Sequence, residues 1–276
     1  MSLASKWAKV TKSRVLTFNG YCFNDRFAIG NISRPLAEYA SESHGVDGAD
    51  GERFGSLNLG TRRFSFDIMV GDMTPAQVQE AARELAAALL VREPGKFTFS
   101  DERADNRQLF RYAVPDGPVD VDEFMHAGKW TLDFVQHDPF LYKAGEPSEV
   151  HLRAGEKTKV VFGGTAPCFP MVEATCRNST YYKVTAHDRD GDEVGHVTYK
   201  ADFATFDPAD GPVITLEGES PKHTLYLDFD RQSARMVPPQ HGARGLQPGS
   251  EFFACHGKLF VTSSHNAVMR WRERYA

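Results

Sequence analysis

The stretch KWTLDFVQHDPFLY, residues 129–142, decides how the rest of this chain can fold. Alternate residues of a strand face the same side of a sheet, and one such set here is Trp130, Leu132, Phe134 and Gln136. This alternation predicts a half-buried strand. Asp138-Pro139 should end the strand, because proline has no N–H for a sheet and disfavours helix before it. We therefore predict the last strand of a first domain, followed by a linker at residues 144–148.

Two domains are expected from the length and from this linker. The chain has 276 residues, which is more than a single hydrophobic core usually serves. Residues 1–145 are predicted to form the first domain and residues 146–276 the second. The fold class expected for the whole chain is mainly β with one helix.

Composition indicates a soluble globular protein with a β-rich interior. Hydrophobic residues make up 41%, charged residues 25% and aromatic residues 12%, and the formal net charge is −5. Lys and Arg are not in excess, so the composition does not indicate binding to nucleic acid or to an anionic lipid surface. The longest purely apolar run, Leu85–Val91, is too short to span a membrane.

The beginning of the sequence and the cysteines indicate a reducing compartment. The start, MSLASKWAKV, lacks the apolar core of a signal peptide, so we expect synthesis in the cytoplasm. The four cysteines are widely spaced, and reduced thiols are expected in a cytosolic chain of this size.

The first domain is predicted to be an antiparallel sheet with one helix laid across it. Asn19-Gly20 lies between two apolar stretches of Val15–Phe27 and predicts a hairpin, because Asn-Gly suits the tight turn that joins two strands. Further strands are expected at residues 62–70, 96–99 and 109–114. In the first of these, Phe64, Phe66 and Ile68 alternate and should share one buried face.

One helix is expected, at about residues 74–91. Thr74 is the predicted N-cap, Pro75 suits the first helical position, and Gln77 completes a capping box. An apolar stripe at helical spacing should pack on the sheet; its members are Val78, Ala82, Leu85 and Leu89.

The segment 41–60 is rich in glycine and poor in large apolar residues. It cannot pack a core alone, so we predict a long loop or a Gly-rich arm. Its isolated apolar residues, Phe54, Leu57 and Leu59, are candidate contacts with another subunit. On this hypothesis the arm becomes ordered on assembly, and deletion of residues 47–55 should impair assembly.

The second half of the chain has no helical pattern of any length and is predicted to be a β-sandwich or jelly roll. Short apolar stretches separated by turn signals indicate its strands. They are expected at 159–162, 171–176, 182–187, 194–199, 213–216, 224–229, 252–255, 258–262 and 267–271.

Three segments superficially suggest a metal or phosphate site. Gly45–Gly51 has the spacing G-x-x-G-x-x-G, which is no nucleotide-binding motif, so a mobile loop is expected. Asp188–Glu193 lacks the Gly and Glu positions of a calcium loop and indicates a hairpin turn instead. Cys168 and Cys176 do not have zinc-ligand spacing, and Cys176 is expected to be a small buried residue.

No catalytic residue, metal site or cofactor is predicted. The chain lacks the serine elbow, the H-E-x-x-H motif and a cysteine-nucleophile signature. Tyr181 and Trp271 are candidates for stacking on a sugar ring, although buried packing is the usual role of large aromatic residues.

Several motifs, in order, resemble one protein family. They are FNG at 18–20, RRFSFDIMV at 62–70 before the single helix, KFTFSDE at 96–102, RYAV at 111–114, WTLDFVQHDPFLY at 130–142 and the C-terminal GLQPG at 245–249. This order resembles the distal tail proteins of long-tailed, non-contractile phages. The resemblance covers most of residues 14–276.

The resemblance implies a structural protein of a phage or prophage. Such proteins form a hexameric ring at the tail tip, or baseplate, in which the N-terminal domain joins the tail-tube protein to the tail-hub protein. The C-terminal domain is a galectin-like sandwich that presents receptor-binding proteins or contacts a cell-surface glycan. A virion component of this kind would be made in the bacterial cytoplasm and assembled into the tail tip.

Two other functions remain open from the residues alone. A carbohydrate-binding sandwich would recognise host-surface glycans, and it is compatible with the ring. A glycan hydrolase would need two placed carboxylates, which cannot be chosen from the 37 acidic residues of this sequence.

Overall fold

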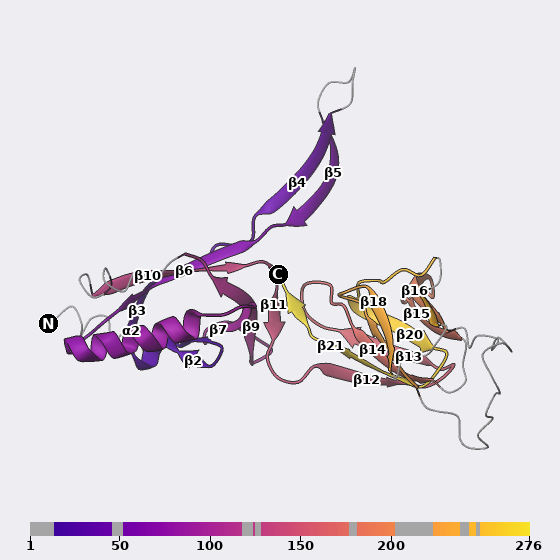
Figure 1. The fold of residues 1–276 in the computed structure, drawn as a ribbon. Coiled ribbons are helices and arrows are strands. Elements are labelled where there is room, and N and C mark those ends of the chain that lie inside the picture. Colours follow the sequence, from indigo (N-terminus) through magenta and orange to yellow (C-terminus); the bar gives the residue numbers. More distant parts are fainter. Residues whose placement is uncertain are drawn as a thin grey trace, which may run out of the picture. The chain divides into compact units, whose positions relative to one another are not determined.

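The computed structural model describes residues 14–45, 52–117, 124, 128–176, 181–201, 223–237, 243–246 and 249–276. The chain divides into two compact units, residues 1–144 and 145–275, with Ala276 grouped with the first. The described residues are mainly strand with one α-helix, α2, and one short 3-10 helix, η1 (Phe23–Asp25) (Figure 1). The predicted fold class, mainly β with one helix, is confirmed.

The first unit is built on an antiparallel sheet in the order β2-β1-β7-β9-β10-β6-β3. The seven strands are β1 (Leu16–Phe18), β2 (Tyr21–Cys22), β3 (Ala28–Ser33), β6 (Arg62–Met69), β7 (Gly95–Phe99), β9 (Arg107–Pro115) and β10 (Lys129–Gln136). Two short strands, β8 (Arg103–Ala104) and β11 (Leu141–Lys143), also pair with β9.

Strand β10 is the strand that the sequence predicted within residues 129–142. It joins the two halves of this sheet. It pairs with β6 along its whole length, from Lys129 opposite Met69 to Gln136 opposite Arg62, and with β9 at its other edge. Phe134 is buried and stacks on Phe64, with ring centroids 5.3 Å apart. The strand ends two residues before Asp138, which confirms its predicted end.

The Asn-Gly turn near the start of the chain is confirmed. Asn19 and Gly20 have φ angles of 48° and 87°, the left-handed region that this tight turn requires. They join β1 to β2, with Phe18 opposite Tyr21.

Helix α2 (Pro75–Leu89) is confirmed, including its start. The Thr74 hydroxyl accepts a hydrogen bond from the Gln77 backbone N–H, and the Gln77 side chain accepts one from the Thr74 N–H. Val78, Leu85 and Leu89 are buried in one cluster with phenylalanines of the sheet. The helix therefore covers the sheet with the apolar stripe that the sequence indicated.

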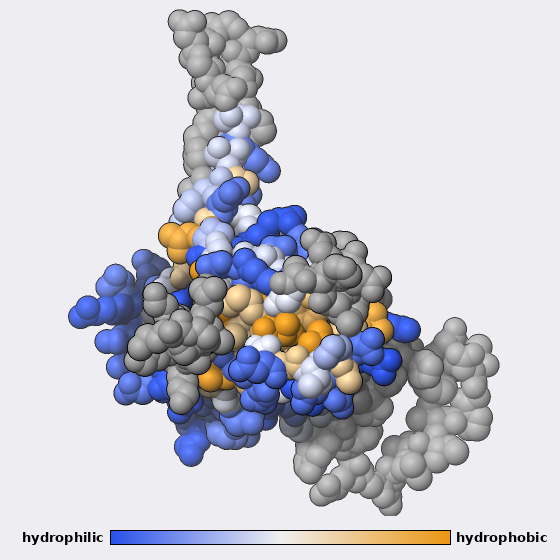
Figure 2. Space-filling model, turned by 90° about the vertical axis from the view of Figure 1, so that its left-hand side faces the viewer, coloured by the Kyte–Doolittle hydropathy of each residue, from blue (hydrophilic) through white to orange (hydrophobic). Residues whose placement is uncertain are grey.

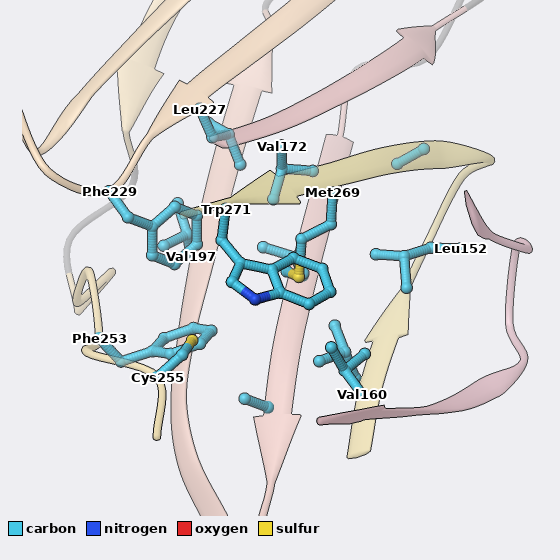
Figure 3. Packing of buried hydrophobic residues seen from close by; sticks show 14 of the residues in the cluster. Leu152, Val160, Val172, Val197, Leu227, Phe229, Phe253, Cys255, Met269 and Trp271 are labelled. Carbon is cyan, nitrogen blue, oxygen red and sulfur yellow. The ribbon is translucent and has the colours of Figure 1, made fainter. Parts of the chain in front are cut away.

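The second unit is a sandwich of two five-stranded antiparallel sheets. One has the order β12 (Ser148–Leu152), β21 (Ala267–Trp271), β14 (Met171–Cys176), β17 (His223–Asp228), β18 (Ser233–Val237). The other has the order β13 (Lys157–Phe162), β20 (Gly257–Ser263), β15 (Tyr181–His187), β16 (Glu193–Ala201), β19 (Ala243–Leu246). A single buried cluster takes residues from both sheets (Figure 3). The galectin-like strand order stays a prediction.

Two details of the predicted strands in this half need correction. Residues 252–255 form no strand; only Cys255 makes an isolated bridge, to Cys168. Strands β12, β18 and β19, which are only four or five residues long, were not predicted. The strand expected at 213–216 lies outside the described residues.

Candidate assembly surfaces

The segment expected to be a long loop or a Gly-rich arm is a β-hairpin. Strands β4 (Tyr39–Gly45) and β5 (Glu52–Leu59) form a separate two-stranded sheet, which we call the arm. The pairing of two strands in this segment was not predicted, because the described side chains of β4 are exposed on both faces, and such a strand needs no apolar alternation. Of the glycine segment 45–51, residues 46–51 lie outside the described part, so the loop expected there stays a prediction.

The arm has little packing of its own. Tyr39 is 68% exposed, and residues 40–43 are also exposed. In both Figures 1 and 2 the hairpin extends away from the sheet of its own unit. A two-stranded ribbon is at best marginally stable in water, so a hairpin of this kind gains most from a surface that covers it.

The three apolar positions proposed as arm contacts all oppose alternate residues of β4. The register pairs Tyr39 with Leu59, Ser41 with Leu57 and Ser43 with Phe54. A register shift after Glu42 brings position 54 into this series. The side chains of Phe54 and Leu57 lie outside the described part of the chain, whereas Leu59 is half-buried. Their role as contacts stays a prediction.

The root of the arm is tied to the body of its unit by Arg34. The Arg34 guanidinium donates to both carboxylate oxygens of Asp101, at 3.0 and 2.8 Å, and to Glu102 at 3.1 Å. It also lies 4.6 Å from the centre of the Phe99 ring. On the other strand of the root, the Gly60 N–H donates to the Glu38 carbonyl at 2.7 Å. The two ends of the arm are therefore joined to each other, and Arg34 ties them to the body of the unit.

The charges at this root are well matched. Burial alone would raise the pKa of Asp101, but the hydrogen bonds and positive charge of Arg34, with the charge of Arg14, lower it below its ordinary value. Burial would lower the pKa of Arg34, and Asp101 raises it above its ordinary value. Both groups stay charged at neutral pH, which keeps the ion pair intact.

Beside this anchor lies a small apolar surface. Leu36 is 81% exposed and belongs to the segment between β3 and the arm. Tyr39 follows at the first residue of β4 and is also exposed. Neither residue was singled out from the sequence.

The sequence-predicted sugar contacts are not brought together. Trp271 is only 7% exposed, and its ring lies 4.8 Å from that of Phe162 inside the sandwich core. Figure 3 shows the indole among Met269, Val197 and other core side chains. Trp271 therefore packs in the core, which is the usual role of a large aromatic residue, because alternation along β21 points it inward. Tyr181, at the start of β15, is 47% exposed.

A hollow of about 560 Å³ lies on the sandwich, on the sheet that contains β12, β14 and β21. None of the described residues that line it is Phe, Tyr or Trp; the lining is His151, Leu152, Arg153, Ala154, Glu156, Glu173, Thr175, Asn266, Ala267 and Val268. Next to it, Arg270 bridges Glu149 and Glu173 at 2.7 Å each. Charged side chains paired with one another make a polar surface there without an aromatic platform for a sugar.

The metal-like motifs have structural roles. The Asp188 carboxylate accepts hydrogen bonds from the backbone N–H groups of Asp190, Gly191 and Asp192, each at 2.9 Å. It therefore holds the predicted hairpin turn between β15 and β16. Within the described residues, no three His, Cys, Asp or Glu side chains gather as a metal-binding group.

Comparison with known proteins shows which solved structure has this architecture. The sequence matches no family model and no curated protein. Among solved structures, the Dit protein (gp 19.1) of phage SPP1 matches with a TM-score of 0.70 at 16% identity, over 95% of this chain and 99% of that chain. The chain has the Dit fold. The resemblance to distal tail proteins seen in the sequence is thus confirmed at the level of the fold.

Other matches to the Dit fold are weaker. Two structures of the phage P2 baseplate in its activated conformation, with Ca and with Sr, give TM-scores of 0.44 and 0.45 at 10% identity. Both cover 94% of this chain and 98% of theirs. These scores are too low to carry an argument. In the described part of this Dit-like chain, no helix is long and apolar enough to cross a membrane.

Proposed function

We propose that this chain is a structural subunit of a phage tail tip, and that copies of it close into a ring, of six as the family resemblance implies. The observation that carries this proposal is the match over nearly the whole length of both chains to the Dit protein of SPP1, described as a paradigm of the hub adsorption apparatus in phages of Gram-positive bacteria. Closed rings use heterologous contacts, in which one surface meets a different surface of the next copy.

The arm supplies one side of that contact in this proposal. It is a hairpin whose described side chains are largely exposed, on a root held by the Arg34–Asp101 ion pair. A rigid root fixes the direction of the arm and reduces the entropy lost on assembly. Leu36 and Tyr39 supply apolar area that another copy covers, together with Phe54, Leu57 and Leu59.

The test is the particle size of the purified chain, alone and mixed with a tail-hub protein, by mass photometry and electron microscopy. We expect rings of the unaltered chain. The double variant Leu36→Ser, Tyr39→Ser should lose them while keeping its thermal midpoint, because both side chains are exposed in the single chain. Leu90→Ser, at a residue 87% exposed after α2, is the matched control and should assemble normally.

If the double variant assembles as well as the unaltered chain, Leu36 and Tyr39 are not part of the interface. An unaltered chain that forms no ring even with the hub protein present would contradict the ring itself. The remaining partners in this proposal are the tail-tube protein on one side of the ring and receptor-binding proteins carried by the sandwich.

Glycan binding is the second candidate function, and Tyr181 is the exposed aromatic residue that favours it. If the sandwich contacts cell-surface sugar through this ring, Tyr181→Ala should abolish binding on a glycan array. An unchanged signal would exclude Tyr181 as the platform. Because Trp271 is buried, its substitution would test folding rather than sugar binding.

A further inference from the structure

Two irregular segments of the sandwich meet at a pair of cysteines. Cys168 lies between β13 and β14, and Cys255 lies just before β20. The Cys168 N–H donates to the Cys255 carbonyl at 2.9 Å, and the Cys255 N–H donates to the Cys168 carbonyl at 2.8 Å. The two residues therefore form an antiparallel bridge in which each is directly opposite the other.

This geometry suits a disulfide. Opposed residues that exchange both backbone hydrogen bonds have Cα atoms about 5.5 Å apart, and disulfides join residues with Cα separations of about 4.4–6.8 Å. Directly opposite side chains lie on the same face. The Cys168 Sγ lies 3.4 Å from the Cys255 carbonyl oxygen, so this sulfur is close to the backbone of the opposite cysteine.

Both sulfurs lie in the same buried cluster. Cys168 is 1% exposed and Cys255 is fully buried, and Figure 3 shows Cys255 beside Phe253 in the core. Cys22 belongs to the first unit, in β2, and the side chain of Cys176 is outside the described part. Among the described cysteines, Cys168 and Cys255 are the two that face each other in register.

We propose that Cys168 and Cys255 are a latent disulfide site, reduced in the cytoplasm and closed by a small-molecule disulfide outside it. One cysteine thiolate attacks a sulfur of oxidised glutathione and releases one glutathione thiolate. The second cysteine thiolate then attacks the mixed disulfide and releases the other. Two electrons pass from the protein sulfurs to the oxidant, and the two protein thiol protons end on the two glutathione molecules.

The surroundings make this closure slow. Burial raises the pKa of Cys168 to about 12, and burial also raises the pKa of Cys255. The thiolate is the attacking species, and little of it forms while the thiols are buried. The first step therefore requires local opening of the two segments. The cell exterior as the place of oxidation rests on the proposed function in a virion, whereas the site itself does not.

Closure would link two residues that are 87 positions apart in the sequence. A cross-link over a long loop restricts the unfolded chain and so stabilises the folded one. Both segments are irregular and are joined at this bridge. The disulfide would therefore hold together two segments that are not part of either sheet.

The experiment incubates the full chain with oxidised glutathione, with and without urea below the unfolding transition, and follows it by intact mass and non-reducing peptide mapping. We expect the loss of two hydrogen masses, a peptide that links Cys168 to Cys255, and faster closure in urea. The thermal midpoint should rise, and dithiothreitol should reverse the rise. Cys22→Ala should behave identically, whereas Cys168→Ala and Cys255→Ala should each lose the linked species.

Complete alkylation of both cysteines after incubation in urea would overturn the proposal, as would a product that stops at a glutathione adduct. A linked chain with a lower thermal midpoint would show that the native bridge cannot accommodate the bond, and would also overturn it. All readouts use the single chain, so failure of ring assembly does not affect them. Because the peptide map is made on the unaltered chain, a variant that fails to fold leaves the test intact.

Discussion

Leu85 and Leu90 show how the position of a leucine decides its contribution to the free energy of unfolding. Leu85 is 1% exposed on the inner face of α2, whereas Leu90, just past the helix, is 87% exposed. We expect Leu85→Ala to lower the free energy of unfolding by about 2–5 kcal/mol, because it leaves a cavity in the core. Leu90→Ala should change it by less than about 0.5 kcal/mol. Urea denaturation measures both, and equal effects would contradict the packing of α2 on the sheet.

Asp67 is a buried carboxylate that only the structure explains. It is 3% exposed, its carboxylate accepts hydrogen bonds from Thr131 at 2.6 Å and from Asn31, and the Lys129 ammonium lies 2.7 Å away. Burial alone would raise its pKa, but these donors outweigh burial and hold the pKa below its ordinary value.

The resulting pH dependence has a definite sign. A carboxyl whose pKa is lower in the folded than in the unfolded chain contributes stability above its unfolded pKa of about 3.9. That contribution is lost as pH falls below this value and through the folded pKa. We expect Asp67→Asn to cost about 1–3 kcal/mol at pH 7, because its charged hydrogen bonds are lost. In urea titrations the difference from the unaltered chain should shrink toward pH 3; a constant difference would contradict this assignment.

At the scale of elements, the start of α2 is set locally. The capping box of Thr74 and Gln77 satisfies backbone N–H groups that the helix leaves without partners. Thr74→Ala should lower the free energy of unfolding by about 0.5–2 kcal/mol, and Thr74→Ser should restore most of it. Thermal unfolding followed by circular dichroism measures the change. Equal loss in the alanine and serine variants would show that the hydroxyl contributes nothing.

The arm is the element for which local reasoning failed. The described side chains of β4 are exposed on both faces, so the alternation that identified β6 and β10 is missing there, and the glycines suggested a long loop or an arm. Its anchor depends on Arg34 reaching Asp101 across 67 positions of sequence. No local pattern contains that contact, because it exists only once β3 and β7 lie in one sheet. The exposed apolar root was missed for the same reason.

At the scale of the whole molecule, each unit has its own buried cluster. The cluster of the first unit is rich in phenylalanine, and the cluster of the second draws on both sheets of the sandwich. We propose that each unit is an independent folding domain. Residues 145–276, expressed alone, should give a dispersed NMR spectrum and one cooperative unfolding transition. A fragment that stays unfolded would show that this core depends on residues 1–144.

Local sequence patterns were enough to predict the elements whose cause is local: the Asn19-Gly20 turn, the capped helix and the period-2 strands β6 and β10. The sequence also indicated the Dit fold, because the motifs that mark those elements follow one another in the same order as in that family. Three features are visible only in the folded chain: Trp271 packs on Phe162, β4 pairs with β5, and Cys168 lies opposite Cys255. Each of these depends on which distant strand lies opposite, and that is set by the packing of whole sheets rather than by neighbouring residues.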